Sequence, residues 1–96
     1  MATLFVEYRI KPEHTQAHLQ ALRALMRENA DLQALESADE PGLYVELWQS
    51  PGNADPGLAR ARTEQLSRAR TEQLAPLAEG GDARVRCWTF NNIDDQ

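Results

Sequence analysis

Hydrophobic and polar residues alternate along three stretches of this chain, residues 4–10, 43–49 and 85–90. Alternation with a period of two is the pattern of a β-strand whose two faces meet different surroundings. The middle stretch is the clearest, because turn residues bound it on both sides, Pro41-Gly42 before it and Ser50-Pro51-Gly52 after it. We therefore predict strands at all three places and put the middle one at the centre of a sheet.

Residues 31–38 allow two interpretations. Helix propensity alone would let them continue the helix that comes before them. A dense cluster of turn residues follows at 37–42, however, and the strand after it needs an antiparallel neighbour. We therefore predict a short strand at about 31–38, joined to the central strand by a hairpin through residues 39–41.

A helical spacing of three and four begins near Pro12, a residue that is tolerated in the first turn of a helix. The apolar stripe of this predicted helix is formed by Leu19, Leu22, Leu25 and Met26. We expect the helix to end near Asn29, because asparagine tolerates the left-handed conformation of a helix cap.

A second helix is predicted from Asp55-Pro56 to about residue 78, with Pro76 disturbing its last turn. It contains a tandem octamer, in which the sequence of 61–68 repeats until residue 74. Equivalent positions in the two copies are rotated by about 80° around a helix, so they do not form one narrow apolar stripe. We interpret the polar residues of both copies, such as Arg62 and Glu64 and their repeats, as a solvent-exposed helix face.

The predicted order is strand, helix, two strands, helix, strand. This is the ferredoxin-like βαββαβ arrangement, an α+β fold in which a four-stranded antiparallel sheet has both helices on one face. Residues 1–96 are expected to form one such domain. The aliphatic sides of the strands are expected to face the helices; their side chains are Leu4, Val6, Ile10, Leu43, Val45, Leu47, Val85 and Cys87.

The other side of the predicted sheet carries aromatic and charged side chains, which are Phe5, Glu7, Arg9, Tyr44, Glu46, Trp48, Arg84, Arg86, Trp88 and Phe90. Such a surface is too apolar to stay exposed on a soluble monomer. A two-fold axis matches one patch to itself, so a second copy of the chain is the simplest cover. We therefore predict a homodimer with its sheets face to face, in which these carboxylates and guanidinium groups pair.

The chain has 10 basic and 15 acidic residues and a net charge of −5. An acidic chain without a basic cluster is a poor candidate for binding nucleic acid or an anionic membrane. We find no apolar run of membrane-spanning length and no signal-peptide pattern, and the single cysteine cannot form an internal disulfide. The expected location is the cytoplasm.

Three segments together resemble the antibiotic-biosynthesis-monooxygenase-like branch of the dimeric α+β barrel superfamily: residues 5–12 (FVEYRIKP), 41–50 (PGLYVELWQS) and 74–77 (LAPL). The resemblance implies a dimeric barrel with a small aromatic or quinol-like molecule bound between the sheet and the helices of each subunit. It also implies one of two functions. The first is cofactor-independent monooxygenation, and the alternative is a non-enzymatic homodimeric module for ligand binding or interaction.

Tyr8 is the candidate catalytic residue that this resemblance suggests, as a proton donor or acceptor or as a substrate anchor. A buried structural tyrosine is the competing interpretation. The side chains expected to surround Tyr8 in the pocket are Leu22, Met26, Leu47, Cys87 and Thr89. Cys87 is interpreted as a small core residue, because no base or positive charge is predicted on its side of the strand.

Haem-degrading members of the superfamily carry a strand-one asparagine where this chain has Tyr8, and a second-helix histidine that this chain lacks. Haem degradation is therefore not expected. His14 and His18 are four residues apart in the first helix, a spacing that suits a metal, but no third ligand accompanies them. We predict no metal and no cofactor.

Overall fold

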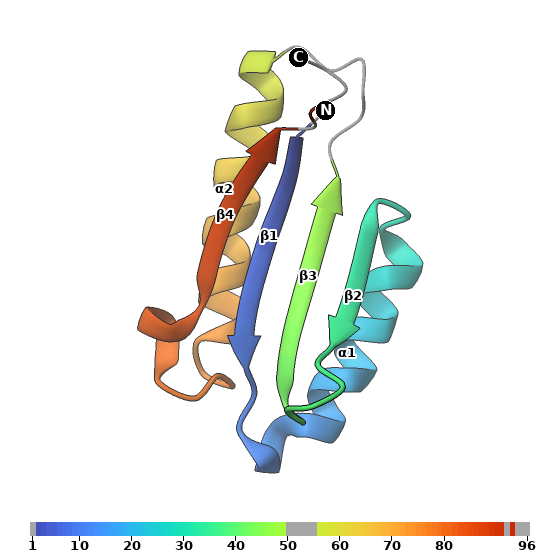
Figure 1. Cartoon of the computed structure of the whole chain (residues 1–96), viewed down its shortest axis with the longest axis vertical. Coiled ribbons are helices and arrows are strands. Elements are labelled where there is room, and N and C mark those ends of the chain that lie inside the picture. Colours follow the sequence, from blue (N-terminus) through green and yellow to red (C-terminus); the bar gives the residue numbers. More distant parts are fainter. Residues whose placement is uncertain (1, 50–55, 92, 94–96) are drawn as a thin grey trace.

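The computed structural model describes residues 2–49, 56–91 and 93 (Figure 1). Strands and helices follow the predicted order, with two short 3-10 helices in addition. The elements are β1 (Ala2–Arg9), η1 (Pro12–His14), α1 (Thr15–Glu28), β2 (Leu32–Glu36), β3 (Leu43–Gln49), α2 (Pro56–Leu74), η2 (Gly81–Arg84) and β4 (Arg86–Asn91). The short strand at 31–38 is confirmed as β2.

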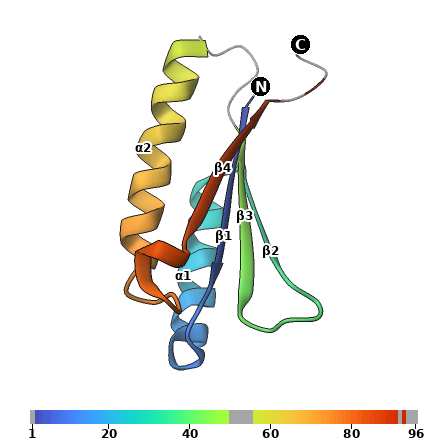
Figure 2. The ribbon, with the colours of Figure 1, turned by 60° about the vertical axis from the view of Figure 1, so that its left-hand side comes forward.

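The four strands form one antiparallel sheet in the order β2-β3-β1-β4. Both helices cover the same side of this sheet, as Figure 2 shows when the strands are seen nearly edge-on. The fold is therefore α+β, and its topology is compatible with the predicted ferredoxin-like arrangement. Within the described residues, no helix combines the length and the apolar character that crossing a bilayer requires.

The hairpin between β2 and β3 turns at Gly42, which has a φ of 90°. Residues that carry a side chain rarely adopt this backbone conformation, so glycine suits the end of the turn. The amide of Ile10 donates a hydrogen bond to the Gly42 carbonyl at 2.9 Å, and this bond joins the hairpin to the end of β1. The predicted turn dipeptide therefore also anchors the neighbouring strand.

α2 ends at Leu74, earlier than the predicted residue 78, because Pro76 has no amide proton with which to continue the helix. The chain then forms an isolated antiparallel bridge between Ala78 and Ile10. α1 ends at Glu28, and the predicted left-handed cap at Asn29 is wrong. Asn29 is extended, with a φ of −131°, and its side-chain amide donates to the Leu25 carbonyl.

The core lies between the sheet and the helices. From β1, Leu4, Val6 and Ile10 are almost completely buried, and Leu22 of α1 and Leu74 of α2 belong to the same cluster. Full burial of a side chain of this size contributes roughly 1.5–3 kcal/mol. The predicted inward face of β1 is confirmed.

The predicted faces of β3 are wrong. Tyr44, Glu46 and Trp48 are buried beneath the helices, where the strand register pairs them with Tyr8, Val6 and Leu4 of β1. Leu43, Val45 and Leu47 consequently point away from the helices. The prediction assumed that aliphatic residues would face the core, but Glu46 finds a buried cation on the helix side, as described below.

We call the sheet side turned away from the helices the open face. Strand pairing and burial place its apolar side chains, which are Phe5, Leu35, Leu43, Val45, Leu47, Trp88 and Phe90. Arg84 was predicted on this face as part of the last strand, but it lies in η2 before β4 begins. Its exposed side chain packs beside Gly80, whose φ is 81°.

Candidate functional site

A fully buried carboxylate, that of Glu46, lies in the middle of β3 under the helix layer. Its oxygens accept four hydrogen bonds from three side chains. Oε1 accepts from Trp48 Nε1 at 2.9 Å and from Arg70 Nε at 2.8 Å. Oε2 accepts from the Tyr8 hydroxyl and from Arg70 Nη2, both at 2.5 Å. A buried charge is stable only with such complete pairing.

Arg70 of α2 supplies the cation, and its two parallel hydrogen bonds grip Glu46 in the bidentate geometry that suits a carboxylate. Its Nη1 donates to Gln73 Oε1 at 2.7 Å. Burial alone lowers the pKa of Arg70, but the hydrogen bonds and charge of Glu46 outweigh burial and raise it. The predicted solvent-exposed face is therefore wrong for Arg70, which belongs to the second octamer copy.

His18 of α1 extends the network, because its Nε2 lies 3.0 Å from the Tyr8 hydroxyl oxygen. Tyr8 has a single hydroxyl proton and donates it to Glu46, since a carboxylate can only accept. His18 Nε2 must then carry the proton that it donates to Tyr8. This tautomer leaves Nδ1 as an acceptor, and Nδ1 makes no hydrogen bond to any described residue.

The protonation states of this network follow from its burial. Burial, together with the charge and hydrogen bond of Glu46, raises the pKa of Tyr8 far above its ordinary value, so Tyr8 stays a neutral phenol. Burial lowers the pKa of His18, despite the opposing charge of Glu46, so its imidazole is neutral at pH 7. Tyr8 therefore cannot act as a phenolate base, whereas His18 is in the form that can accept a proton.

His18, Tyr8, Glu46 and Arg70 connect α1, β1, β3 and α2 in one hydrogen-bonded chain, which we call the relay. Tyr8 was recognised from the sequence, whereas the roles of His18 and Arg70 were not. A signal existed for His18, which lies four residues before Leu22 and so shares the apolar stripe of α1. For Arg70 the only signal was its rotation of about 80° from the exposed Arg62.

The residues predicted to form one pocket lie in three separate places. Leu22 and Met26 line an apolar pocket of about 120 Å³ between α1, β2 and β3, together with Tyr44 and Glu36. We call it the α1 pocket. The remaining residues lie elsewhere: Cys87 and Thr89 line a groove of about 260 Å³ beside α2, and Leu47 lies on the open face.

The hydroxyl of Tyr44 is buried and has no hydrogen-bond partner among the described residues. Its ring lies 5.0 Å from the His18 ring and stacks at 5.9 Å on that of Tyr8, measured between centroids. Burial and the nearby charge of Glu36 raise the pKa of Tyr44, so the phenol is neutral. Tyr44 thus connects the α1 pocket with the relay.

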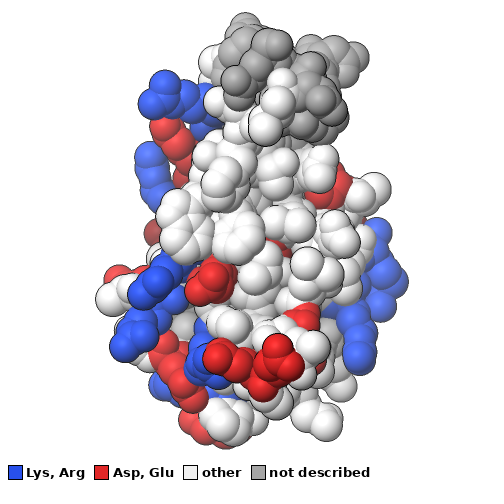
Figure 3. Space-filling view, in the orientation of Figure 1, with Lys and Arg blue, Asp and Glu red and all other residues white. Residues whose placement is uncertain are grey.

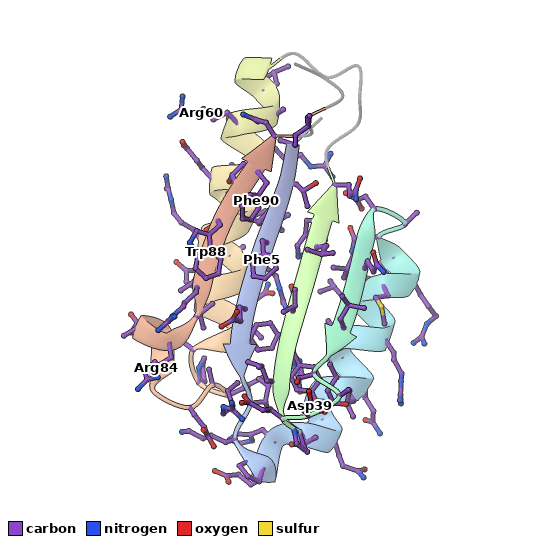
Figure 4. All side chains as sticks on the ribbon, in the orientation of Figure 1. Phe5, Asp39, Arg60, Arg84, Trp88 and Phe90 are labelled. Atoms are coloured by element: carbon purple, nitrogen blue, oxygen red, sulfur yellow. The ribbon has the colours of Figure 1, made fainter. Side chains whose placement is uncertain are left out.

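The open face is broadly uncharged at its centre, as Figure 3 shows from the side of the strands. Phe5, Trp88 and Phe90 form an aromatic cluster on it (Figure 4), with ring centroids 5.3 Å apart for Phe5–Trp88 and 6.1 Å for Phe5–Phe90. Trp88 is 43% exposed and Phe90 55%. Towards one end of the sheet the face becomes charged, around a groove of about 380 Å³ lined by Glu7, Tyr8, Arg9, Glu40, Leu43, Glu79, Gly80, Arg84 and Arg86.

Among residues 2–49, 56–91 and 93, no three His, Cys, Asp or Glu side chains come together as a group that could hold a metal ion. His14 and His18 do not form a shared metal site, because the His18 imidazole points inward and contacts the Tyr8 hydroxyl. A scan of the chain against models of protein families finds no match, and neither does a search of curated proteins.

Proposed function

We propose that this protein is a homodimer of the α+β barrel type that binds a small aromatic or quinol-like molecule between sheet and helices and oxidises it without metal or flavin. The observation that supports the chemistry is the relay, in which a neutral His18 is backed by Tyr8 and Glu46. Direct oxidation by O₂ requires an electron-rich anion, so the protein must first remove a proton from the substrate.

In this proposal His18 accepts the substrate proton at Nδ1 and becomes an imidazolium. Tyr8 transmits the stabilising effect of the Glu46 carboxylate to that imidazolium through their short hydrogen bonds. Arg70 holds the carboxylate in place through its two parallel hydrogen bonds. Tyr8 is then a positioning residue and not the base, which revises the role that the sequence suggested for it.

Oxygen uptake with a panel of quinols tests the base. We expect His18→Gln to abolish most of the uptake, while His14→Gln, the matched change one helical turn earlier, leaves it unchanged. Tyr8→Phe should shift the pH profile, because the imidazolium loses its link to Glu46. Uptake that is unchanged in His18→Gln would remove the relay from the reaction.

The homodimer is supported by the aromatic cluster on the open face, because apolar surface of this kind is rarely left in water. The outward Leu43, Val45 and Leu47 make this face more apolar than the sequence predicts. A self-complementary sheet surface is what a two-fold axis requires.

Native mass spectrometry at micromolar concentration tests the dimer. We expect Trp88→Glu to convert dimer to monomer, because a charge cannot enter the apolar interface without a partner. Leu58→Glu is the matched control, since Leu58 is 70% exposed on α2 and should leave the dimer intact. A monomeric wild type would contradict the dimer directly.

The second candidate function is a non-enzymatic homodimeric module for ligand binding or interaction. It is favoured by one observation, the burial of Tyr8, which is 1% exposed and whose hydroxyl is hydrogen-bonded to His18 and Glu46. Ligand binding without oxygen uptake, in a protein that remains dimeric, would select this candidate over the first.

A further inference from the structure

The hydroxyl of Tyr44 has no hydrogen-bond partner within the described chain, although Tyr44 is only 1% exposed. Buried hydroxyl groups are almost always paired, because leaving one unpaired forfeits the hydrogen bonds that it made with water. Tyr8, the neighbouring tyrosine on the same side of the sheet, pairs with two groups. The Glu36 carboxylate is close enough to raise the pKa of Tyr44 but is not within hydrogen-bond distance of its hydroxyl, so a ligand between the two groups could pair with both.

Tyr44 lines the α1 pocket, whose other walls are mostly aliphatic and come from Leu19, Leu22, Met26 and Ala34. The volume of about 120 Å³ is comparable with the cavity of roughly 150 Å³ that accommodates benzene in an engineered protein core. Two charged side chains, Arg23 and Glu36, also reach this pocket. Its size and lining suit one six-membered ring with a single polar substituent.

We infer that the α1 pocket binds a single-ring phenol, with the ring among Leu22 and Met26 and the ligand hydroxyl against Tyr44 and Glu36. A hydroxyl both accepts and donates, so it can accept from the Tyr44 hydroxyl while it donates to the Glu36 carboxylate. This inference rests on the proposed binding of an aromatic molecule between sheet and helices, and it gives that molecule a place and a recognition group.

Entry requires a small movement, because the Tyr44 hydroxyl is covered in the free protein. Glu36 is an exposed residue near the end of β2, and its carboxylate is held by one long contact of 3.3 Å with the Gly42 amide. A flexible side chain held this weakly can rotate to admit a ligand at little cost. The Tyr44 ring lies against His18, so a bound phenol would be a close neighbour of the relay.

Titration with phenol and with toluene, followed by NMR, tests the inference on the whole chain. The two probes share a ring and differ by hydroxyl against methyl. We expect wild-type protein to bind phenol about tenfold more tightly, the value of one good hydrogen bond. Tyr44→Phe should reduce this preference without abolishing it, because the phenol hydroxyl can still donate to the Glu36 carboxylate. Met26→Trp should lose both, because the indole fills the pocket, while Thr89→Ala in the α2 groove should change neither.

Equal affinities in wild-type protein, absence of phenol binding, or a preference that is undiminished in Tyr44→Phe would each overturn the inference. A thermal scan of Tyr44→Phe gives an independent readout that needs no ligand. Removing an unpaired hydroxyl should leave the unfolding temperature unchanged or raise it. A large fall would show that the hydroxyl has a partner, and would also overturn the inference. Phenol binding without oxygen uptake would leave this site standing and reject only the proposed oxidation.

Discussion

The two octamer copies in α2 carry the same residues in different surroundings. Arg62 in the first copy has a side chain that is 55% exposed, and it pairs with Asp31 at 3.4 Å. Arg70, its equivalent in the second copy, is 8% exposed and holds Glu46 at 2.5 Å. Eight residues leave equivalent side chains about 80° apart around the helix. The two arginines have the same local sequence, so their different burial and pairing come from the direction in which each points and from the residue that it meets there.

Replacing each arginine by alanine should give the largest difference in unfolding free energy between the two copies. Arg70→Ala leaves the Glu46 carboxylate buried without its cation, which we expect to cost about 3–5 kcal/mol of unfolding free energy. Arg62→Ala removes an exposed pair worth about 0–1 kcal/mol. Urea unfolding of both variants measures the difference. Equal losses would mean that the two copies are not distinguished by burial.

The equivalent leucines should show the next largest difference. Leu74 is 1% exposed in the core, whereas Leu66 is partly buried. Leu74→Ala should cost about 3 kcal/mol through lost burial and the cavity that remains. Leu66→Ala should cost about half as much, because less of its surface leaves water on folding. Thermal or urea unfolding measures both, and a larger loss at Leu66 would contradict the assigned helix orientation.

The network of the second copy should also make stability depend on pH. Burial lowers the pKa of His18 in the folded state below the unfolded value of about 6.5, so the unfolded chain binds more protons in that window. The contribution of neutral His18 to the free energy of unfolding is therefore fully present above about pH 6.5. It decreases as the pH falls towards the pKa of His18 in the folded state. Urea unfolding between pH 5 and 7.5 should show this slope.

In His18→Gln the slope should flatten, while His14→Gln should keep it, because only His18 lies against the relay. A slope that persists in His18→Gln would assign the pH dependence to another group.

Salt should give the smallest difference between the copies. Raising the ionic strength to 1 M shortens the screening length to about 3 Å, which weakens exposed ion pairs and leaves buried ones nearly unchanged. The stability difference between wild-type protein and Arg62→Ala should shrink by a few tenths of a kcal/mol, whereas the cost of Arg70→Ala should persist. A cost of Arg70→Ala that disappears in salt would show that the Glu46 pair is hydrated.

The order of elements and the faces of β1 were predictable from the sequence, because alternation and turn residues are local signals. The inward residues of β3 were not, because alternation identifies two faces without saying which one meets the helices. Leu43, Val45 and Leu47 form the more aliphatic set, yet Glu46 and Trp48 are the buried ones.

At the candidate site, Tyr8 was recognised while His18 and Arg70 were missed. Their contacts join residues 10 to 38 positions apart in the chain, which no local pattern records. The open face was predicted as an aromatic and charged surface, and Phe5, Trp88 and Phe90 do lie on it. The pocket was predicted as one site because the sequence does not show that the α1 and α2 sides of the helix layer are lined separately.

Glu46 also determines the register in which β3 pairs with its neighbours in the sheet. A slip of one residue would turn Leu43, Val45 and Leu47 towards the helices, and hydrophobic burial alone would discriminate weakly against it because both sides of the strand are apolar. The slipped strand would, however, expose Glu46 on the open face and leave Arg70 buried without an anion, at a cost of several kcal/mol. One charge pair between distant segments thus selects a single register for a strand that its hydrophobic pattern leaves ambiguous.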